Sequence, residues 1–113
     1  MVRKKYIPQR GDIVWLNFDP QSGHEQKGKQ PAMVISPKEY NAKTCLGLFC
    51  PITGSVKDYP FEVQIDCKNI KGVVLADRVK SLDWETRKAE FIEKMPAEGI
   101  GEVIEKIGVL LSE

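Results

Sequence analysis

The sequence has 113 residues, 42% of them hydrophobic, which is enough for one compact core but too few for two stable domains. We therefore expect a single domain over residues 1–113. The 17 basic and 16 acidic side chains nearly cancel, so net charge neither favours nor excludes a polyanionic partner. Residues 1–44 hold eight Lys or Arg and four Asp or Glu, whereas residues 82–113 hold four and eight. A basic first half would suit nucleic acid, although solvated charge without a function is the commoner interpretation.

The three cysteines form no Cys-x-x-Cys pair and cannot all pair within the chain, which argues against a secreted disulfide scaffold. We expect Cys45 and Cys50 to be small core-filling residues. A single histidine, His24, disfavours a zinc site, and we expect neither metal nor cofactor. The basic N-terminus is followed by no apolar stretch, which predicts a cytoplasmic protein without a signal peptide or membrane span.

Residues 12–18 are rich in β-branched and aromatic side chains and are bounded by Gly11 and Asp19-Pro20, which predicts a strand. Alternation would place Val14, Leu16 and Phe18 on one face and Trp15 on the other. Residues 19–30 form a polar, glycine-containing loop, and Pro31 opens a second apolar run at residues 32–36. The loop is therefore expected to join two neighbouring strands.

Residues 37–44 predict one short helical turn, and residues 45–50, 61–65, 72–76 and 79–82 predict further strands. Short strands separated by Gly, Pro and Asp turns are typical of a small antiparallel sheet or barrel. After Pro96, apolar residues recur at helical spacing, which predicts an amphipathic helix that packs on the sheet. Its apolar positions are Ile100, Val103, Ile104, Ile107, Leu110 and Leu111.

Three ordered blocks carry a family resemblance: RGDIVW at residues 10–15, GHEQKGKQPA at residues 23–32 and PIT at residues 51–53. Together they resemble the MazF/PemK toxins. Residues 59–63, residues 72–80 and the terminal helix are also similar to that family. Each block alone occurs by chance, but their order and spacing make coincidence a poor explanation.

The resemblance implies an α+β, mainly β fold: a curled, SH3-like antiparallel barrel of the PemK/CcdB type with a C-terminal helix. It also implies a type II toxin that acts as a homodimer and is occluded by a MazE-like antitoxin. The expected activity is sequence-specific, metal-independent cleavage of single-stranded mRNA, which inhibits translation and growth. The products would be a 2′,3′-cyclic phosphate and a 5′-hydroxyl.

In the family, a loop arginine and a threonine stabilise the phosphate and transfer protons. The threonine corresponds to Thr53. The alternative is that the Thr53 hydroxyl has only a structural role and ends a strand by bonding its own backbone. The arginine corresponds to Gln30, which can donate hydrogen bonds but carries no charge. Lys29 or Lys27 would then supply the cation, the toxin would be weakened, or the glutamine would be a deliberate substitution. We expect substantial loss of activity unless Lys29 compensates.

Other loop residues are candidates for the same site. Glu25 and Gln26 match the family's pair that shapes the loop and contacts bases, and His24 is an acid or base candidate because its ordinary pKa is about 6.5. Taken without the resemblance, Glu25 and Gln26 are better explained as a solvated polar turn, and an exposed histidine without a function is the slightly commoner interpretation of His24. Aromatic side chains that could stack bases are Trp15, Phe18, Tyr59 and Trp84, although most aromatics are core. The predicted catalytic residues are Thr53, Gln30, Glu25 and His24, and the predicted RNA-binding residues are Phe18, Gln26, Lys27, Gly28, Lys29, Pro31, Asp77, Arg78 and Lys80.

Two other function classes compete with the nuclease hypothesis. A CcdB-like toxin shares the fold and poisons a topoisomerase through its C-terminal helix, usually with terminal aromatics, which this chain lacks. A generic SH3-like peptide-binding module would need an exposed aromatic groove, and the basic loop argues mildly against it.

Overall fold

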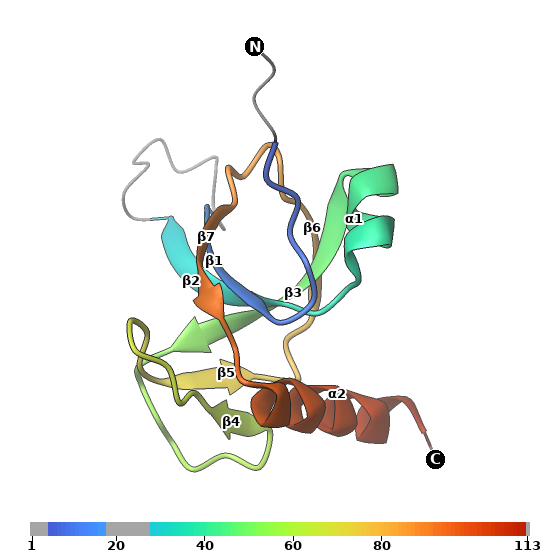
Figure 1. The fold of residues 1–113 in the computed structure, drawn as a ribbon. Coiled ribbons are helices and arrows are strands. Elements are labelled where there is room, and N and C mark those ends of the chain that lie inside the picture. Colours follow the sequence, from blue (N-terminus) through green and yellow to red (C-terminus); the bar gives the residue numbers. More distant parts are fainter. Residues whose placement is uncertain (1–4, 18–27, 113) are drawn as a thin grey trace.

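The computed structural model describes residues 5–17 and 28–112, so the predictions for Phe18, His24, Glu25, Gln26 and Lys27 fall outside the described residues. Seven strands and two helices make up the described fold (Figure 1). They are β1 (Asp12–Asn17), β2 (Lys29–Val34), α1 (Lys38–Thr44), β3 (Leu46–Thr53), β4 (Glu62–Gln64), β5 (Val73–Leu75), β6 (Lys80–Asp83), β7 (Glu90–Lys94) and α2 (Ala97–Leu111).

The strands form one antiparallel sheet in the order β4-β5-β3-β2-β1-β7, and β6 also pairs with β3. Within the described residues the end strands β4 and β7 do not pair, so the sheet is open. Figure 1 shows α2 lying along β4 and β5 at one end of the molecule, while α1 lies beside β3. The predicted mainly β, antiparallel fold with a C-terminal helix is confirmed.

The sheet buries apolar side chains on both of its faces. Alternating residues of β1 divide between the two cores, because Ile13 packs in one and Val14 and Leu16 in the other. The first core also holds Met33, Val74 and Val103, and the second is closed by Phe49, Leu82 and Trp84. Trp15 points to the opposite face from Val14 and Leu16, as the alternation predicts, and is 36% exposed.

A buried polar network joins α1 to the rest of the fold. The Asn41 amide donates to the carbonyl oxygens of Pro8 at 2.8 Å and Ser36 at 3.1 Å. The Ser36 hydroxyl donates to the Asn41 side-chain oxygen and accepts from the Leu48 amide, at 2.5 and 2.8 Å. The Asn41 carbonyl in turn accepts the indole N–H of Trp84 at 3.1 Å. These bonds satisfy the buried polar groups and fix β3 against α1.

Three sequence predictions need correction. β2 begins at Lys29, so residues 29–30 are strand rather than loop. Cys45 is exposed in the left-handed region with φ 60°, at the C-cap of α1, and is no core residue, because the helix must end before β3 begins. Cys50 is buried as expected, and that burial raises the pKa of its thiol to about 12. β7 was not predicted, and its charged sequence becomes a strand through pairing with β1.

Candidate functional site

The site lies where two paired strands separate. β2 and β3 pair from Ala32 opposite Pro51 to Val34 opposite Phe49, but their pairing stops beyond Pro51. From there β2 continues along β1, while β3 turns to β5 and pairs Ile52 with Val74 and Thr53 with Val73. Pro31 and Pro51 stand at this separation, where a missing N–H donor removes no ladder bond between the two strands.

A cavity of about 500 Å³ opens between the separated strands, and we call it the basic cavity. Among the described residues, two cationic side chains, Arg78 and Lys80, and no carboxylate line it. Gln30 approaches from β2 and Thr53 from β3, so the two residues that the family resemblance singles out face the same space. The described residues that line it are Gln30, Pro51, Ile52, Thr53, Gly54, Leu75, Arg78 and Lys80.

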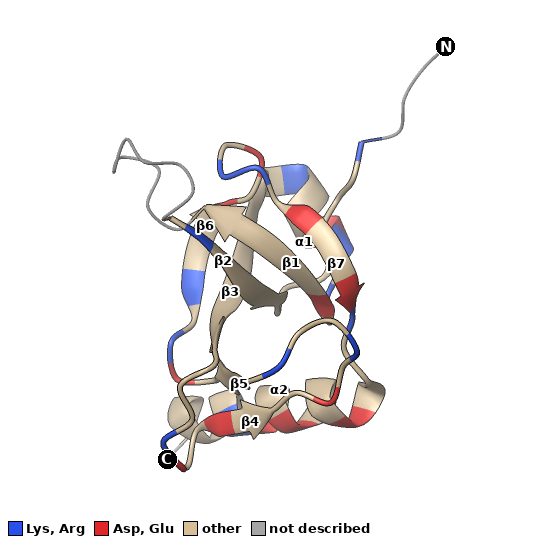
Figure 2. Ribbon diagram, turned by 90° about the vertical axis from the view of Figure 1, so that its left-hand side faces the viewer, with Lys and Arg blue, Asp and Glu red and all other residues tan. Residues whose placement is uncertain are grey.

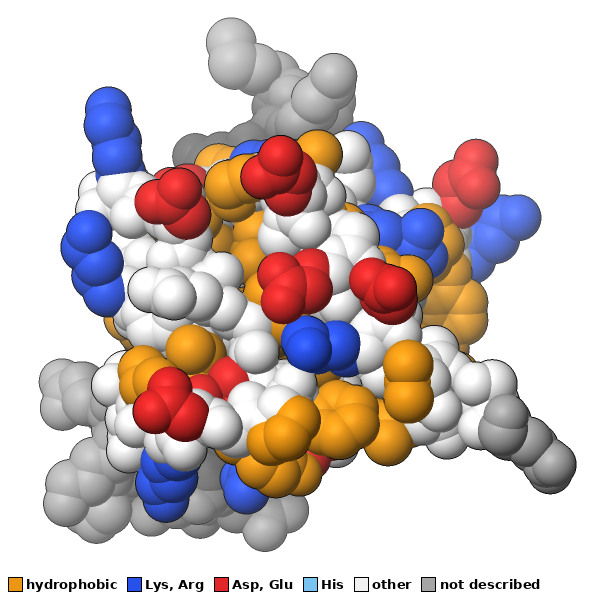
Figure 3. Space-filling view, turned by 90° about the horizontal axis from the view of Figure 1, so that it is seen from below, with side chains coloured by type: hydrophobic (Ala, Val, Ile, Leu, Met, Phe, Trp, Pro, Cys, Tyr) orange, Lys and Arg blue, Asp and Glu red, His pale blue; other side chains and the backbone are white. Residues whose placement is uncertain are grey.

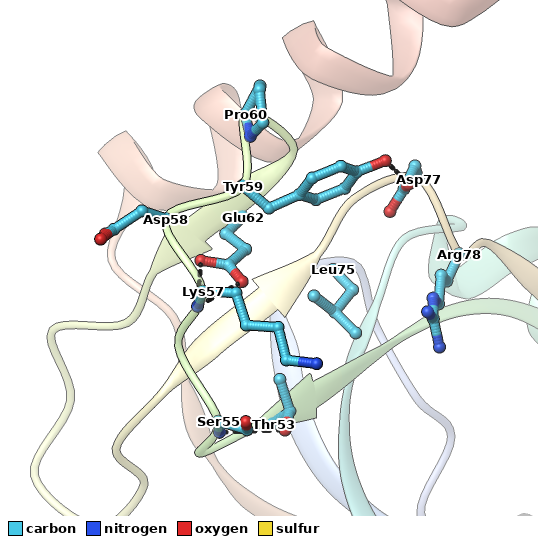
Figure 4. Close-up of a pocket in the computed structure, with 10 residues that line it drawn as sticks. All are labelled: Thr53, Ser55, Lys57, Asp58, Tyr59, Pro60, Glu62, Leu75, Asp77 and Arg78. Carbon is cyan, nitrogen blue, oxygen red and sulfur yellow. Dashed lines mark hydrogen bonds between the residues drawn. The ribbon is translucent and has the colours of Figure 1, made fainter.

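A second cavity of about 610 Å³ adjoins the first and shares Thr53, Leu75 and Arg78 with it (Figure 4). We call it the tyrosine cavity, because the exposed ring of Tyr59 forms part of its wall. The Tyr59 hydroxyl donates to Asp77 at 2.6 Å, and this bond is the main reason that the pKa of Tyr59 is raised. The other oxygen of Asp77 is buried and accepts no hydrogen bond within the described part of the chain.

The tyrosine cavity is the more acidic of the two. Its lining contains Lys57 and Arg78 but also the carboxylates of Asp58, Glu62 and Asp77. Glu62 is held in place because it accepts the backbone N–H of Lys57 at 3.0 Å. Polyanion backbone therefore fits the basic cavity, whereas amino groups that donate hydrogen bonds fit the acidic end of the tyrosine cavity.

Thr53 closes β3 at the junction of the two cavities. Its hydroxyl oxygen accepts the backbone N–H of Ser55 at 3.1 Å, so its proton is still available to donate. Gly72, at φ +130°, lies against the end of this strand, and a Cβ there would sit 2.2 Å from the Thr53 carbonyl oxygen. Only glycine permits this close approach of β5 to Thr53.

The predicted loop residues 28, 29 and 31 lie at the start of β2, and none of them lines a cavity. Lys29 forms an ion pair with Glu90 of β7 at 3.1 Å and lines neither cavity. Gly28 is buried just before β2, and Pro31 is half-buried opposite Trp15. The expectation that Lys29 replaces the family arginine therefore has no support in the geometry, since its ammonium is held by β7.

Arg78, Lys80 and Asp77 all line a cavity, in line with their grouping from the sequence. Trp84 is 4% exposed and bonded to α1, so it cannot stack a base. Ser55, Lys57, Glu62 and Leu75 were not singled out from the sequence as site residues, although Glu62 lies inside the quoted block of residues 59–63. No motif within that block marks a cavity wall, because the wall arises from the packing of residues 55–62 against β5.

Charge is distributed along the molecule as the sequence suggests (Figure 2). α2 carries Glu98, Glu102 and Glu105 against a single basic residue, Lys106.

Within residues 5–17 and 28–112, no group of three or more His, Cys, Asp or Glu side chains could hold a metal ion. No helix of the same residues is long and apolar enough to cross a membrane.

Comparison with known proteins gives the family. The family described as "PemK-like, MazF-like toxin of type II toxin-antitoxin system" matches residues 9–111. The endoribonuclease toxin MazF of Escherichia coli K12 is 43% identical over 107 residues, covering 95% of this chain and 96% of the relative. The endoribonuclease PemK of Escherichia coli is 30% identical, covering 99% and 88%.

Solved structures agree with the sequence comparison. The crystal structure of MazF (form I) from Deinococcus radiodurans has a TM-score of 0.85 at 50% identity, over 95% of this chain and 98% of that one. A MazE-MazF crystal structure (form II) from the same organism has a TM-score of 0.85 at 44% identity, over 96% and 98%. The chain therefore belongs to the PemK-like, MazF-like toxins of type II toxin-antitoxin systems.

Proposed function

We propose that this chain is an endoribonuclease toxin that cuts single-stranded mRNA at specific sequences without a metal ion and thereby inhibits translation and growth. The observation that carries the proposal is that Thr53 and Gln30, which come from separate strands, share a cavity that two cations and no carboxylate of the described residues line. The relatives named endoribonucleases support the same activity. Gln30 lowers the turnover relative to an arginine, because a neutral amide stabilises phosphate charge less well.

The proposed reaction is an attack of the ribose 2′-oxygen on the adjacent phosphorus. The new bond closes a 2′,3′-cyclic phosphate, the bond from phosphorus to the 5′-oxygen breaks, and the leaving oxygen takes a proton to become a 5′-hydroxyl. Thr53 donates a hydrogen bond to a phosphoryl oxygen, and Gln30 donates a second. His24 and Glu25, both outside the described residues, are the proposed proton carriers.

RNA follows the two cavities in this proposal. The phosphate lies in the basic cavity near Arg78, Lys80 binds RNA farther along the same cavity, and a neighbouring base lies against Tyr59 and Asp77 in the tyrosine cavity. Phe18, Gln26, Lys27, Gly28, Lys29 and Pro31 would shape the rest of the path. Lys29 would shape this path through its ion pair with Glu90 and would not contact the phosphate.

The partners and setting are proposed on family grounds. The similar MazE-MazF crystal structure from Deinococcus radiodurans supports a MazE-like antitoxin that occludes the site. A homodimer would cover exposed apolar residues, and Val109, Leu110 and Leu111 at the end of α2 are 59%, 50% and 82% exposed. Figure 3 shows hydrophobic side chains gathered on the face seen from below, beside a group of carboxylates. We also propose one domain over residues 1–113, an SH3-like barrel and a cytoplasmic location.

The test of the proposed function is incubation of the purified chain with a long single-stranded RNA in EDTA. Primer extension should map discrete cuts, and end-group analysis should find 5′-hydroxyl and cyclic phosphate ends. Gln30→Arg should raise the rate. Intact RNA with both proteins would contradict the proposal, and inhibition of a topoisomerase by such an inactive chain would favour the CcdB-like alternative.

A further inference from the structure

Attack on a phosphodiester develops negative charge on the phosphoryl oxygens, and a cation placed at those oxygens stabilises it. This inference rests on the proposed function, because it names the residue that supplies that cation. Gln30, which faces the basic cavity, is neutral. The described residues around Thr53 must therefore provide the charge from another element, or the reaction proceeds with hydrogen bonds alone.

Three of the nearby lysines are poorly placed for this role. Lys29 is tied to Glu90 on the far side of β1 and lines neither cavity. Lys57 lines only the tyrosine cavity, which also holds three carboxylates. Lys80 lines the basic cavity but stands opposite Phe49 in the β3 ladder, four residues from Thr53, or about 13 Å at the rise of a strand.

Arg78 has the position that the lysines lack. It lies in the turn between β5 and β6, where its backbone N–H donates to the Leu75 carbonyl at 3.1 Å. That turn follows directly on the strand that pairs with Ile52 and Thr53. Arg78 also lines both cavities, as do Thr53 and Leu75. In Figure 4 the Arg78 side chain extends from its turn on one side of Leu75, and Thr53 lies below Leu75 on the other side.

The surroundings leave the guanidinium of Arg78 available to a phosphate. Its sequence neighbour Asp77 is engaged by the Tyr59 hydroxyl at 2.6 Å. Within the described part of the chain, no carboxylate lies within ion-pair distance of Arg78. A guanidinium stays protonated at every working pH and offers a planar pair of donors that matches two phosphoryl oxygens.

We propose that Arg78 is a catalytic residue that takes over the charge stabilisation missing at position 30. Its guanidinium binds the non-bridging phosphoryl oxygens beside the Thr53 hydroxyl, and it transfers no proton. The cation of this site thus comes from the turn between β5 and β6 instead of from β2. Position 30 and position 78 then serve one purpose, so a positive charge at one of them lessens the dependence of the rate on a charge at the other.

Four proteins test the proposal: the parent, Arg78→Gln, Gln30→Arg and the double variant. Single-turnover rates on RNA in EDTA, at saturating protein, separate chemistry from binding. Arg78→Gln should slow the parent about 10²–10³-fold. In the Gln30→Arg background the same change should cost less than about 10-fold, because the second cation is present. Arg78→Lys should recover part of the rate.

Thermal unfolding of each variant guards against a folding artefact, and Lys43→Gln on the exposed end of α1 is the matched control for the loss of one surface cation. An Arg78→Gln rate within threefold of the parent would overturn the inference. So would equal losses in both backgrounds, or a loss confined to RNA affinity. If the parent cuts RNA and Arg78→Gln cuts equally, only this inference fails; if neither the parent nor Gln30→Arg cuts RNA, the proposed function fails with it.

Discussion

The two halves of β3 have the same backbone conformation but different neighbours. Its first half, residues 46–49, is paired with β6, and Leu48 is bonded to the buried network of Asn41 and Ser36. Its last residues, Ile52 and Thr53, have lost β2 on one side and border two cavities. One strand thus serves as scaffold at one end and carries the candidate site at the other.

This difference shows how a small domain separates stability from chemistry. Bonds near α1 are buried and mutually satisfied, so removing one leaves an unsatisfied group. Groups at the separated end face open space, so a change there costs little folding energy but alters what the cavity binds. Variants at the two ends should therefore affect different measurements.

Thr53→Val should give the largest effect at the cavity end. Valine keeps the shape of the side chain but removes the hydroxyl donor, so the cleavage rate should fall about 10²–10³-fold. The free energy of unfolding should change by less than about 1 kcal/mol, because the hydroxyl accepts only the N–H of Ser55 near the surface. Single-turnover cleavage and urea unfolding measure the two quantities, and a large loss of stability would break the proposed separation.

Asn41→Ala should have the opposite signature. It removes the donor to Pro8 and Ser36 and leaves buried partners unsatisfied, which should lower the free energy of unfolding by about 2–4 kcal/mol. Below the unfolding transition the cleavage rate should stay within about twofold of the parent, since Asn41 lines neither cavity. Lys43→Gln on the same helix is the control for a surface change. A variant that folds normally but cuts poorly would contradict the comparison.

Glu93→Gln should reveal a pH-dependent contribution from the scaffold. The pKa of Glu93 is lowered from 4.5, first by the backbone N–H of Asn69 and also by that of Lys68. A lowered folded pKa contributes stability above the unfolded pKa, and this contribution is lost as the pH falls. The stability gap between parent and variant should therefore shrink between about pH 6 and about pH 3. Urea unfolding across this range measures it, and a gap that widens in acid would refute the role.

Lys29→Gln should give the smallest effect. Both partners of the Lys29–Glu90 pair are about half exposed, at 46% and 64%, so its loss should cost about 0–1 kcal/mol in unfolding. Cleavage should change less than about threefold, because the Lys29 ammonium contacts β7 and not the cavity. If Lys29→Gln instead lowered the cleavage rate as much as Arg78→Gln does, Lys29 on β2 would be the cation that stabilises the phosphate.

Much of this fold follows from local patterns in the sequence. Alternation along β1 predicted that Trp15 points away from the face of Val14 and Leu16, and the spacing after Pro96 predicted α2. β7 was missed because its residues Glu90, Glu93 and Lys94 are charged, and only the pairing with β1 makes them a strand. Cys45 was misplaced because a left-handed cap at the end of α1 has no signature when the residue is not glycine.

The candidate site was only partly predictable. The family resemblance pointed to Thr53 and Gln30, which do line one cavity, but their meeting depends on where β2 and β3 separate. Sequence neighbours suggested Lys29 as the replacement cation, whereas strand pairing directs its side chain to Glu90. Arg78 is 48 positions from Gln30, and only the turn between β5 and β6 brings the two to one cavity.

Binding of RNA phosphate where β2 and β3 separate underlies both proposals. The most direct measurement is amide and methyl NMR of the chain with a 2′-O-methylated oligonucleotide that carries a cut site mapped in EDTA, since the blocked 2′-oxygen prevents cleavage. We expect the strongest shift changes at Thr53, Gln30 and Arg78, with little change at Asn41 and Ser36. Changes centred on α1, with none at Thr53, would contradict binding at this separation.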